Sequence, residues 1–204
     1  MSPDTRTRDR TGPIRYLAMG DSFTIGTGIT PERAFPAVLV ARWRADGREV
    51  WLTNPAVNGY TTEDVIAREV PLAASGRPTL VTLLIGANDI VRGIDDARYR
   101  RQLRRIHDGL RAAGVPAAAV VALPQPEWSR SPAAAPYGTT EALRTRIEGF
   151  NAIAMEEAER VGARYVDLFP LMRRQAAAEM LAPDGLHPSA EAHAELAAAL
   201  VDLI

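Results

Sequence analysis

The chain has 204 residues and contains no cysteine. This absence excludes disulfide bonds, a thiolate nucleophile and zinc sites that depend on cysteine ligands. Histidine is scarce as well, with three residues in the whole chain. A dedicated metal site is therefore poorly supplied, and we expect none.

The charge balance gives no reason to expect a highly charged partner. Lysine is absent, and the 24 basic residues, all arginine, nearly match 25 acidic residues to give a net charge of −1. A protein that binds nucleic acid would instead be expected to carry a basic surface. With 47% hydrophobic and 24% charged residues, the composition is typical of a globular protein.

Long apolar segments are missing too. No run approaches the roughly 18 apolar residues of a membrane-spanning helix. The first twelve residues are polar and rich in arginine, without the apolar stretch of a secretory signal. We expect residues 1–12 to form a short flexible tail, residues 13–204 to form a single domain, and the protein to be cytoplasmic.

Apolar runs of strand length alternate with amphipathic segments of helix length. The predicted strands are Ile14–Met19, Val50–Asn54, Thr79–Ile85, Ala119–Leu123 and Arg164–Asp167. The predicted helices are Phe35–Ala45, Thr62–Ala74, Ala97–Ala113, Thr140–Val161 and Ser189–Ile204. Such alternation predicts right-handed crossovers and a parallel sheet between two layers of helices.

One stretch, Pro124–Gly138, fits neither pattern. It contains four prolines and two aromatic residues, Trp128 and Tyr137. A structureless segment of this length is long for a simple connection and predicts a lid or a pocket wall. The alternative is a surface excursion without function.

Four short motifs lie at ordered positions along the chain. Three follow predicted strands, and the fourth precedes the last predicted helix; they are Gly20-Asp21-Ser22, Asn58-Gly59, Gly86-Ala87-Asn88-Asp89 and Asp184-Gly185-Leu186-His187-Pro188. In an open parallel sheet, ligands bind at the carboxyl ends of the strands. We therefore expect these loops to meet at one site.

The motifs supply the parts of an acyl-transfer site. Ser22 is a candidate nucleophile, His187 a candidate base that titrates near neutrality, and Asp184 a carboxylate that can orient the imidazole. Taken singly, Gly-Asp-Ser could be an ordinary turn with a capping serine. Thr24 stands where the nucleophile elbow of α/β-hydrolases has its second glycine, which argues against that fold.

Three donors could stabilise an oxyanion: the N–H groups of Ser22 and Gly59 and the side-chain amide of Asn88. Asn-Gly is also a common turn pair, and Asn88-Asp89 could be a helix cap. The other two histidines, His107 and His193, fall within predicted helices and are not expected to be catalytic. Asp21 and Asp89 are expected to hold their loops by hydrogen bonds.

Together the four motifs resemble those of the SGNH/GDSL hydrolase family, the GDSL-like esterases and lipases, and the likeness runs from Gly20 to Pro188. The resemblance implies a three-layer α/β/α sandwich with a five-stranded parallel, flavodoxin-like sheet. It also implies a serine hydrolase that cleaves carboxylic esters through Ser22, His187 and Asp184, with an acyl-enzyme and without a cofactor. The partner would be a small acyl ester, and a monomer is the default.

Several functions stay open at this point. The family includes carboxylesterases, thioesterases, lysophospholipases, carbohydrate O-acetylesterases and acyltransferases, and the motifs do not separate them. The compact chain favours short acyl groups. A non-enzymatic, flavodoxin-like module that binds phosphate or flavin is an alternative of a different class, although Asp21 would repel a phosphate. A catalytically inactive relative is disfavoured because the four motifs are intact.

Overall fold

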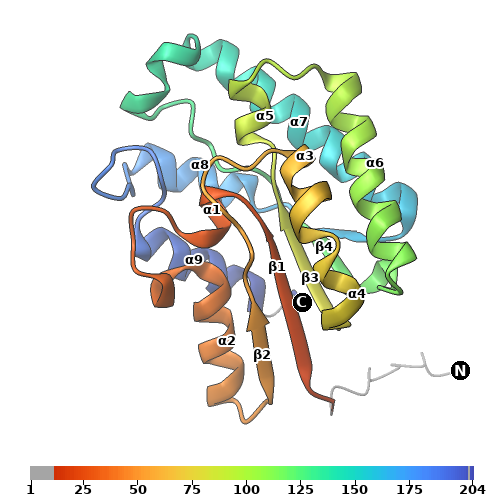
Figure 1. Cartoon of the computed structure of the whole chain (residues 1–204). Coiled ribbons are helices and arrows are strands. Elements are labelled where there is room, and N and C mark those ends of the chain that lie inside the picture. The colour runs from red at the N-terminus through yellow and green to blue at the C-terminus, as the bar shows by residue number, and fades with distance from the viewer. Residues whose placement is uncertain (1–11, 202) are drawn as a thin grey trace, which may run out of the picture.

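The computed structural model describes residues 12–201 and 203–204 and contains a five-stranded parallel sheet (Figure 1). The strands are β1 (Ile14–Gly20), β2 (Val50–Thr53), β3 (Leu80–Leu84), β4 (Val120–Ala122) and β5 (Arg164–Tyr165). All five predicted strands are present with slightly shifted ends, and every neighbouring pair is parallel. The predicted tail, apart from residue 12, lies outside the described residues.

The strand order is β2-β1-β3-β4-β5, the flavodoxin-like order. From β1 the chain passes to β2 on one side and then crosses to β3 on the other. The point where the direction of winding reverses therefore lies between the carboxyl ends of β1 and β3, where a ligand site is expected. Ser22 follows β1 and Asn88 follows β3, so both motifs begin at this point.

Helices cover both faces of the sheet, as the resemblance implied. Helices α2 (Phe35–Ala45) and α9 (Ala190–Val201) pack together on one face, and α6 (Asp96–Ala112) and α7 (Thr140–Val161) pack together on the other (Figure 1). Shorter helices are α1 (Ser22–Ile25), α3 (Thr62–Asp64), α4 (Leu72–Gly76), α5 (Ala87–Val91) and α8 (Phe169–Ala177), with 3₁₀ turns η1 (Pro31–Arg33), η3 (Ala117–Ala119) and η4 (Pro132–Tyr137). Within the described ranges, no helix has the length and apolar character needed to span a membrane.

The predicted continuous helix Thr62–Ala74 is wrong. It begins as expected, because Asp64 Oδ2 accepts the N–H of Thr61 at 2.9 Å in a capping box. A π-helical turn, η2 (Val65–Glu69), then follows, and Pro71 interrupts the segment before α4 because proline has no N–H to donate. The consequence is local: Glu69 at the end of the π turn faces β1 and accepts the N–H of Gly20.

Helix α8 was not predicted at all. It begins at Phe169 with Pro170 in its first turn, a position where the fixed φ of proline is favourable and its missing N–H costs nothing. The segment is short, and proline next to its start resembles a loop signal in sequence. Its buried face, which includes Met172 and Gln175, packs next to α9.

The first part of the proline-rich stretch Pro124–Gly138 lines two cavities, as a pocket wall would, whereas residues 135–138 lie exposed at the surface. Residues 124–129 are buried. The side-chain amide of Asn151 on α7 holds the backbone of Gln125, accepting its N–H at 2.8 Å and donating to its carbonyl at 3.3 Å. Further along, Ser131 Oγ donates to the carbonyl of Gly185 at 2.6 Å. The stretch is therefore fixed at both places.

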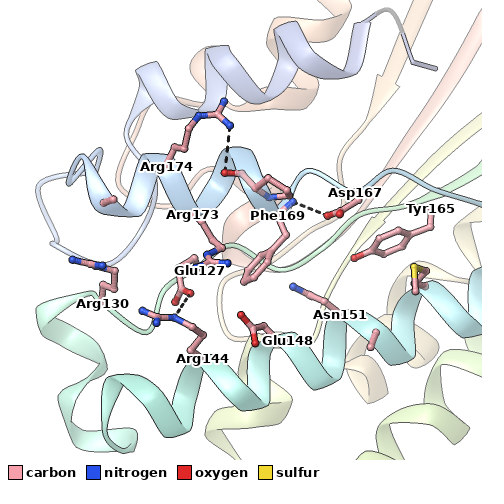
Figure 2. Close-up of a pocket in the computed structure, with 14 residues that line it drawn as sticks. Glu127, Arg130, Arg144, Glu148, Asn151, Tyr165, Asp167, Phe169, Arg173 and Arg174 are labelled. Carbon is pink, nitrogen blue, oxygen red and sulfur yellow. Dashed lines mark hydrogen bonds and ion pairs between the residues drawn. The ribbon is translucent and has the colours of Figure 1, made fainter.

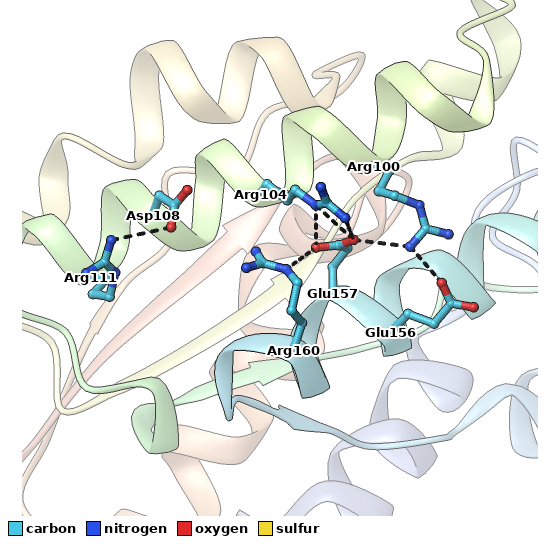
Figure 3. A network of polar contacts seen from close by, with 7 residues as sticks. All are labelled: Arg100, Arg104, Asp108, Arg111, Glu156, Glu157 and Arg160. Atoms are coloured by element: carbon cyan, nitrogen blue, oxygen red, sulfur yellow. Dashed lines mark hydrogen bonds and ion pairs between the residues drawn. The ribbon is translucent and has the colours of Figure 1, made fainter.

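A buried carboxylate joins α6 to α7 (Figure 3). The side chain of Glu157 is 1% exposed and contacts Arg100 and Arg104 from α6 and Arg160 from its own helix, at 2.6–3.1 Å. Burial alone raises the pKa of Glu157, but hydrogen bonds from these three guanidinium groups outweigh burial and lower it to about 2. The ionised form is therefore the one that the fold stabilises.

We expect Glu157→Gln to lower the free energy of unfolding by about 2–4 kcal/mol at neutral pH, because three guanidinium groups lose their buried counter-charge. Since the pKa falls from 4.5 in the unfolded chain to about 2, this contribution is present above pH 4.5 and lost as the pH falls towards 2. Urea unfolding at several pH values measures it. The neighbouring Glu156→Gln, at a 54% exposed side chain, is the control and should cost under about 0.5 kcal/mol.

Candidate active site

The turn after β1 holds Ser22 in place. Gly20 has φ +155°, and a Cβ there would lie 2.2 Å from the carbonyl oxygen of Leu84 at the end of β3. Asp21 caps the short helix that follows, its Oδ1 accepting the N–H of Phe23 at 3.0 Å. Ser22 is thus the first residue of α1, 4% exposed, at the edge of the sheet.

The turn before α9 pairs Asp184 with His187. Asp184 Oδ2 lies 2.6 Å from His187 Nδ1, while Oδ1 accepts the N–H groups of Leu186 and His187 at 2.9 and 3.0 Å. Burial raises the pKa of Asp184, but these hydrogen bonds outweigh it and hold the pKa below its usual value. An ionised Asp184 accepts a hydrogen bond from the Nδ1–H group of His187, which leaves Nε2 of a neutral ring free to act as a base.

The two turns are neighbours. The ring of Phe23, the residue after Ser22, lies beside the His187 ring with centroids 5.3 Å apart. Gly28 lies against the other turn, since a Cβ there would be 3.0 Å from Asp184 Oδ2. Among the described residues no hydrogen bond joins Ser22 Oγ to His187, so the structure brings the two loops together without closing that contact.

The three predicted oxyanion donors lie on loops that contact one another. The N–H groups of Ser22 and Gly59 donate to no acceptor among the described residues. Asn88 Nδ2 donates to the carbonyl of Tyr60 at 2.9 Å and lies 3.5 Å from Asp21 Oδ2. Asn88 therefore connects the residue after Gly59 with the residue before Ser22.

Asp89 is buried behind this site and holds the start of α3. Its Oδ2 accepts the N–H of Thr62 at 3.0 Å, and its Oδ1 lies 2.5 Å from Thr62 Oγ1. Thr62 Oγ1 also lies 2.8 Å from Gln102 Oε1, which must accept because Gln102 Nε2 donates to Glu63 at 2.7 Å. A hydroxyl has one hydrogen, so a proton on Asp89 completes the chain. Burial raises the pKa of Asp89, which also favours its protonated form.

The other two histidines form no hydrogen bond with Ser22, Asp184 or His187 among the described residues, although His193 lines a small cavity together with Phe23 and Pro188. His193 Nδ1 accepts the N–H of Phe35 at 3.1 Å, and its ring stacks on that of Phe35. His107 is buried on α6. Burial lowers the pKa of each ring to about 4, so both are neutral at pH 7. In the part of the chain that the structure describes, no three His, Asp or Glu side chains converge to hold a metal ion.

Two cavities flank the proline-rich wall. A cavity of about 710 Å³ lies between α7 and α8 and contains none of the motif residues; Figure 2 shows Glu127 paired there with Arg144 at 3.0 Å. A small apolar cavity of about 30 Å³ lies on the other side of the same wall, against Phe23, Trp128 and Pro188. Trp128 therefore lines an apolar cavity beside the turn that carries Ser22.

Comparison with known proteins identifies the family. The model of the GDSL-like Lipase/Acylhydrolase family matches residues 18–195. The chain belongs to this family. It is therefore an esterase-type hydrolase, which sets aside the non-enzymatic binding module.

Individual relatives agree with this assignment. The chain is 27% identical over 86% of its length, and 76% of the relative's, to thioesterase 1/protease 1/lysophospholipase L1 of Escherichia coli. It is 30% identical to esterase TesA of Pseudomonas aeruginosa, over 48% of this chain and about half (49%) of that protein. The crystal structure of a lipase/acylhydrolase from Enterococcus faecalis superposes with a TM-score of 0.75 at 25% identity, covering 93% of this chain and 94% of that one.

Proposed function

We propose that the protein hydrolyses carboxylic esters with Ser22 as nucleophile, His187 as general base and Asp184 as the group that orients the base. The observation that carries this proposal is the 2.6 Å contact between Asp184 Oδ2 and His187 Nδ1, beside the ring that follows Ser22. This contact selects the tautomer in which Nε2 is unprotonated. It also stabilises the imidazolium that forms when the ring takes a proton.

In the first step Ser22 Oγ attacks the carbonyl carbon while its proton passes to His187 Nε2. The carbonyl oxygen becomes an oxyanion that can accept hydrogen bonds from the free N–H groups of Ser22 and Gly59. Asn88 Nδ2 keeps its 2.9 Å hydrogen bond to the Tyr60 carbonyl and would donate its second N–H to the oxyanion in place of the 3.5 Å contact with Asp21. Each such donor typically contributes about 3 kcal/mol of transition-state stabilisation. The tetrahedral intermediate then collapses, and the alcohol leaves with the proton from His187.

In the second step the same groups act on water. His187 takes a proton from water as the water oxygen attacks the acyl-enzyme, and Ser22 leaves with that proton when the acid is released. No step requires a cofactor. Asp21 and Asn88 lie next to Ser22 in the site, and their hydrogen bonds support a role for these two residues in positioning the Ser22 turn.

Short acyl groups are the favoured substrates. The apolar cavity beside Phe23 and Trp128 has a volume of about 30 Å³, which is too small for a long alkyl chain. The wall that bounds it is fixed by the contact of Ser131 with Gly185. A cytoplasmic location remains a prediction, as does the monomeric state.

We expect Ser22→Ala and His187→Ala each to lower kcat/KM for p-nitrophenyl acetate by at least about 10³-fold, and the double variant to lose little more, because the two residues act as a unit. Steady-state kinetics at pH 7.5 measures this. Ser75→Ala, at an exposed serine on α4, is the matched control and should be unchanged. Losses that multiply in the double variant would contradict the assignment.

Among p-nitrophenyl esters we expect kcat/KM to fall as the acyl chain lengthens from acetate to decanoate, because the cavity cannot take a longer chain. A preference for decanoate would contradict the assignment to short acyl groups.

Adding an alcohol acceptor to the assay distinguishes hydrolysis from acyl transfer. A free acid as the main product supports the proposal, whereas a transferred ester would identify an acyltransferase. Release of acetate from an acetylated sugar tests the alternative of a carbohydrate O-deacetylase.

A further inference from the structure

Directly beneath the nucleophile turn lies a carboxyl group that the proposed mechanism does not use. Glu69 is fully buried at the end of the π turn, and its Oε2 accepts the N–H of Gly20 at 2.9 Å. Gly20 is the last residue of β1, two residues before Ser22. The contact therefore holds the peptide from which the nucleophile turn begins.

The surroundings of Glu69 offer nothing that would stabilise a negative charge. Its second oxygen, Oε1, is buried and has no hydrogen-bond partner among the described residues. No arginine of the described chain forms an ion pair with it. A buried carboxylate in this position would cost several kcal/mol, whereas a neutral acid with one unpaired hydroxyl costs much less.

A second buried carboxyl group, that of Asp21, is near enough to affect the ionisation of Glu69, and the hydrogen bonds of the two favour the proton on one of them. Asp21 accepts the N–H of Phe23 at 3.0 Å and has the Asn88 amide 3.5 Å from its other oxygen. Glu69 accepts a single N–H, that of Gly20. Burial raises the pKa of both carboxyl groups, to about 7 for Asp21 and to about 8 for Glu69, and the charge of each disfavours that of the other, so the carboxyl with more donors ionises first. The proton belongs on Glu69.

We propose that Glu69 is a positioning residue that works as a neutral carboxylic acid, holding the Gly20 peptide so that Ser22 stays in place. This inference rests on the proposed role of Ser22 as the nucleophile. The π turn is what directs Glu69 towards β1. Such turns are frequent at functional sites.

Besides burial, the two charged groups that act on Glu69, Asp21 and Asp64, both raise its pKa. Burial raises its pKa to about 8, the hydrogen bond from Gly20 opposes this, and the nearby Asp21 and Asp64 raise it further. Helix α6 packs on the π turn as well, and its buried polar side chains, Gln102 and His107, are uncharged at neutral pH. Glu69 is therefore mostly neutral at pH 7 and becomes ionised as the pH rises through about 8, where its charge would repel Asp21 and disturb the turn.

The test compares Glu69→Gln with Glu69→Leu. A glutamine keeps the acceptor for Gly20 and cannot ionise, so its kcat at pH 7 should stay within about 2-fold of the wild type. The wild-type kcat should fall above pH 8, and the Gln variant should stay flat to about pH 9.5. Leucine removes the acceptor and should lower kcat at least about 10-fold with little change in KM. The exposed Glu141→Gln on α7 is the control and should leave both values and the pH profile unchanged.

A second readout does not depend on activity. A carboxyl whose pKa is 4.5 in the unfolded chain and about 8 in the fold makes the protein progressively less stable as the pH rises between these values. Urea unfolding from pH 4.5 to 8 should show this decline in the wild type and a weaker decline in Glu69→Gln. If Ser22 were not the nucleophile, this difference would persist, so the two proposals can fail separately.

Three results would overturn the proposal. The first is a Gln variant as impaired as the Leu variant, or unable to fold, because a neutral acid must be replaceable by an amide. The second is an alkaline loss of kcat that Glu69→Gln retains or the wild type lacks. The third is an unfolding free energy whose pH dependence is the same in both proteins. If the Leu variant does not fold, the pH profiles of the wild type and the Gln variant decide alone.

Discussion

The close approach of β1 and β3 at their carboxyl ends is the constraint on which the candidate site depends. At Gly20 the backbone turns so near to the carbonyl of Leu84 that no side chain fits. This contact places Ser22 and the Gly86–Asp89 loop side by side at the switch point of the sheet. The Asp184–His187 turn lies at the same edge of the sheet, where the His187 ring packs beside the ring of Phe23.

Around this contact, buried carboxyl groups hold the loops in place by hydrogen bonds, which apolar side chains cannot form. Glu69 holds the end of β1, Asp21 connects the turn that carries Ser22 to Asn88, and Asp89 holds the start of α3. Each contact joins two segments far apart in sequence, and each satisfies a backbone N–H or an amide that the loops would otherwise leave unpaired. Burial raises the pKa of both Glu69 and Asp89, which favours their neutral forms and so limits the number of buried charges behind the proposed oxyanion site.

The strands and the motif residues were predictable because their signals are local. Continuous apolar runs mark buried parallel strands, and Asp184 lies three residues from His187 in a turn that the sequence itself encodes. Contacts between distant segments gave no such signal. Glu69 looks like any helical glutamate until the π turn directs it towards Gly20, and α8 was missed because Pro170 at its start resembles a loop residue. The larger cavity between α7 and α8 also depends on tertiary packing alone.

The most direct test of the central claim, that Ser22 is an activated nucleophile, is intact-mass spectrometry after treatment with a fluorophosphonate. The account predicts one covalent adduct per chain, mapped to Ser22 by peptide analysis and absent from Ser22→Ala. It also predicts much slower labelling of His187→Ala, because the base that activates the hydroxyl is then missing. An adduct of equal yield on Ser22→Ala, or no adduct on a wild-type protein that hydrolyses p-nitrophenyl acetate, would contradict it.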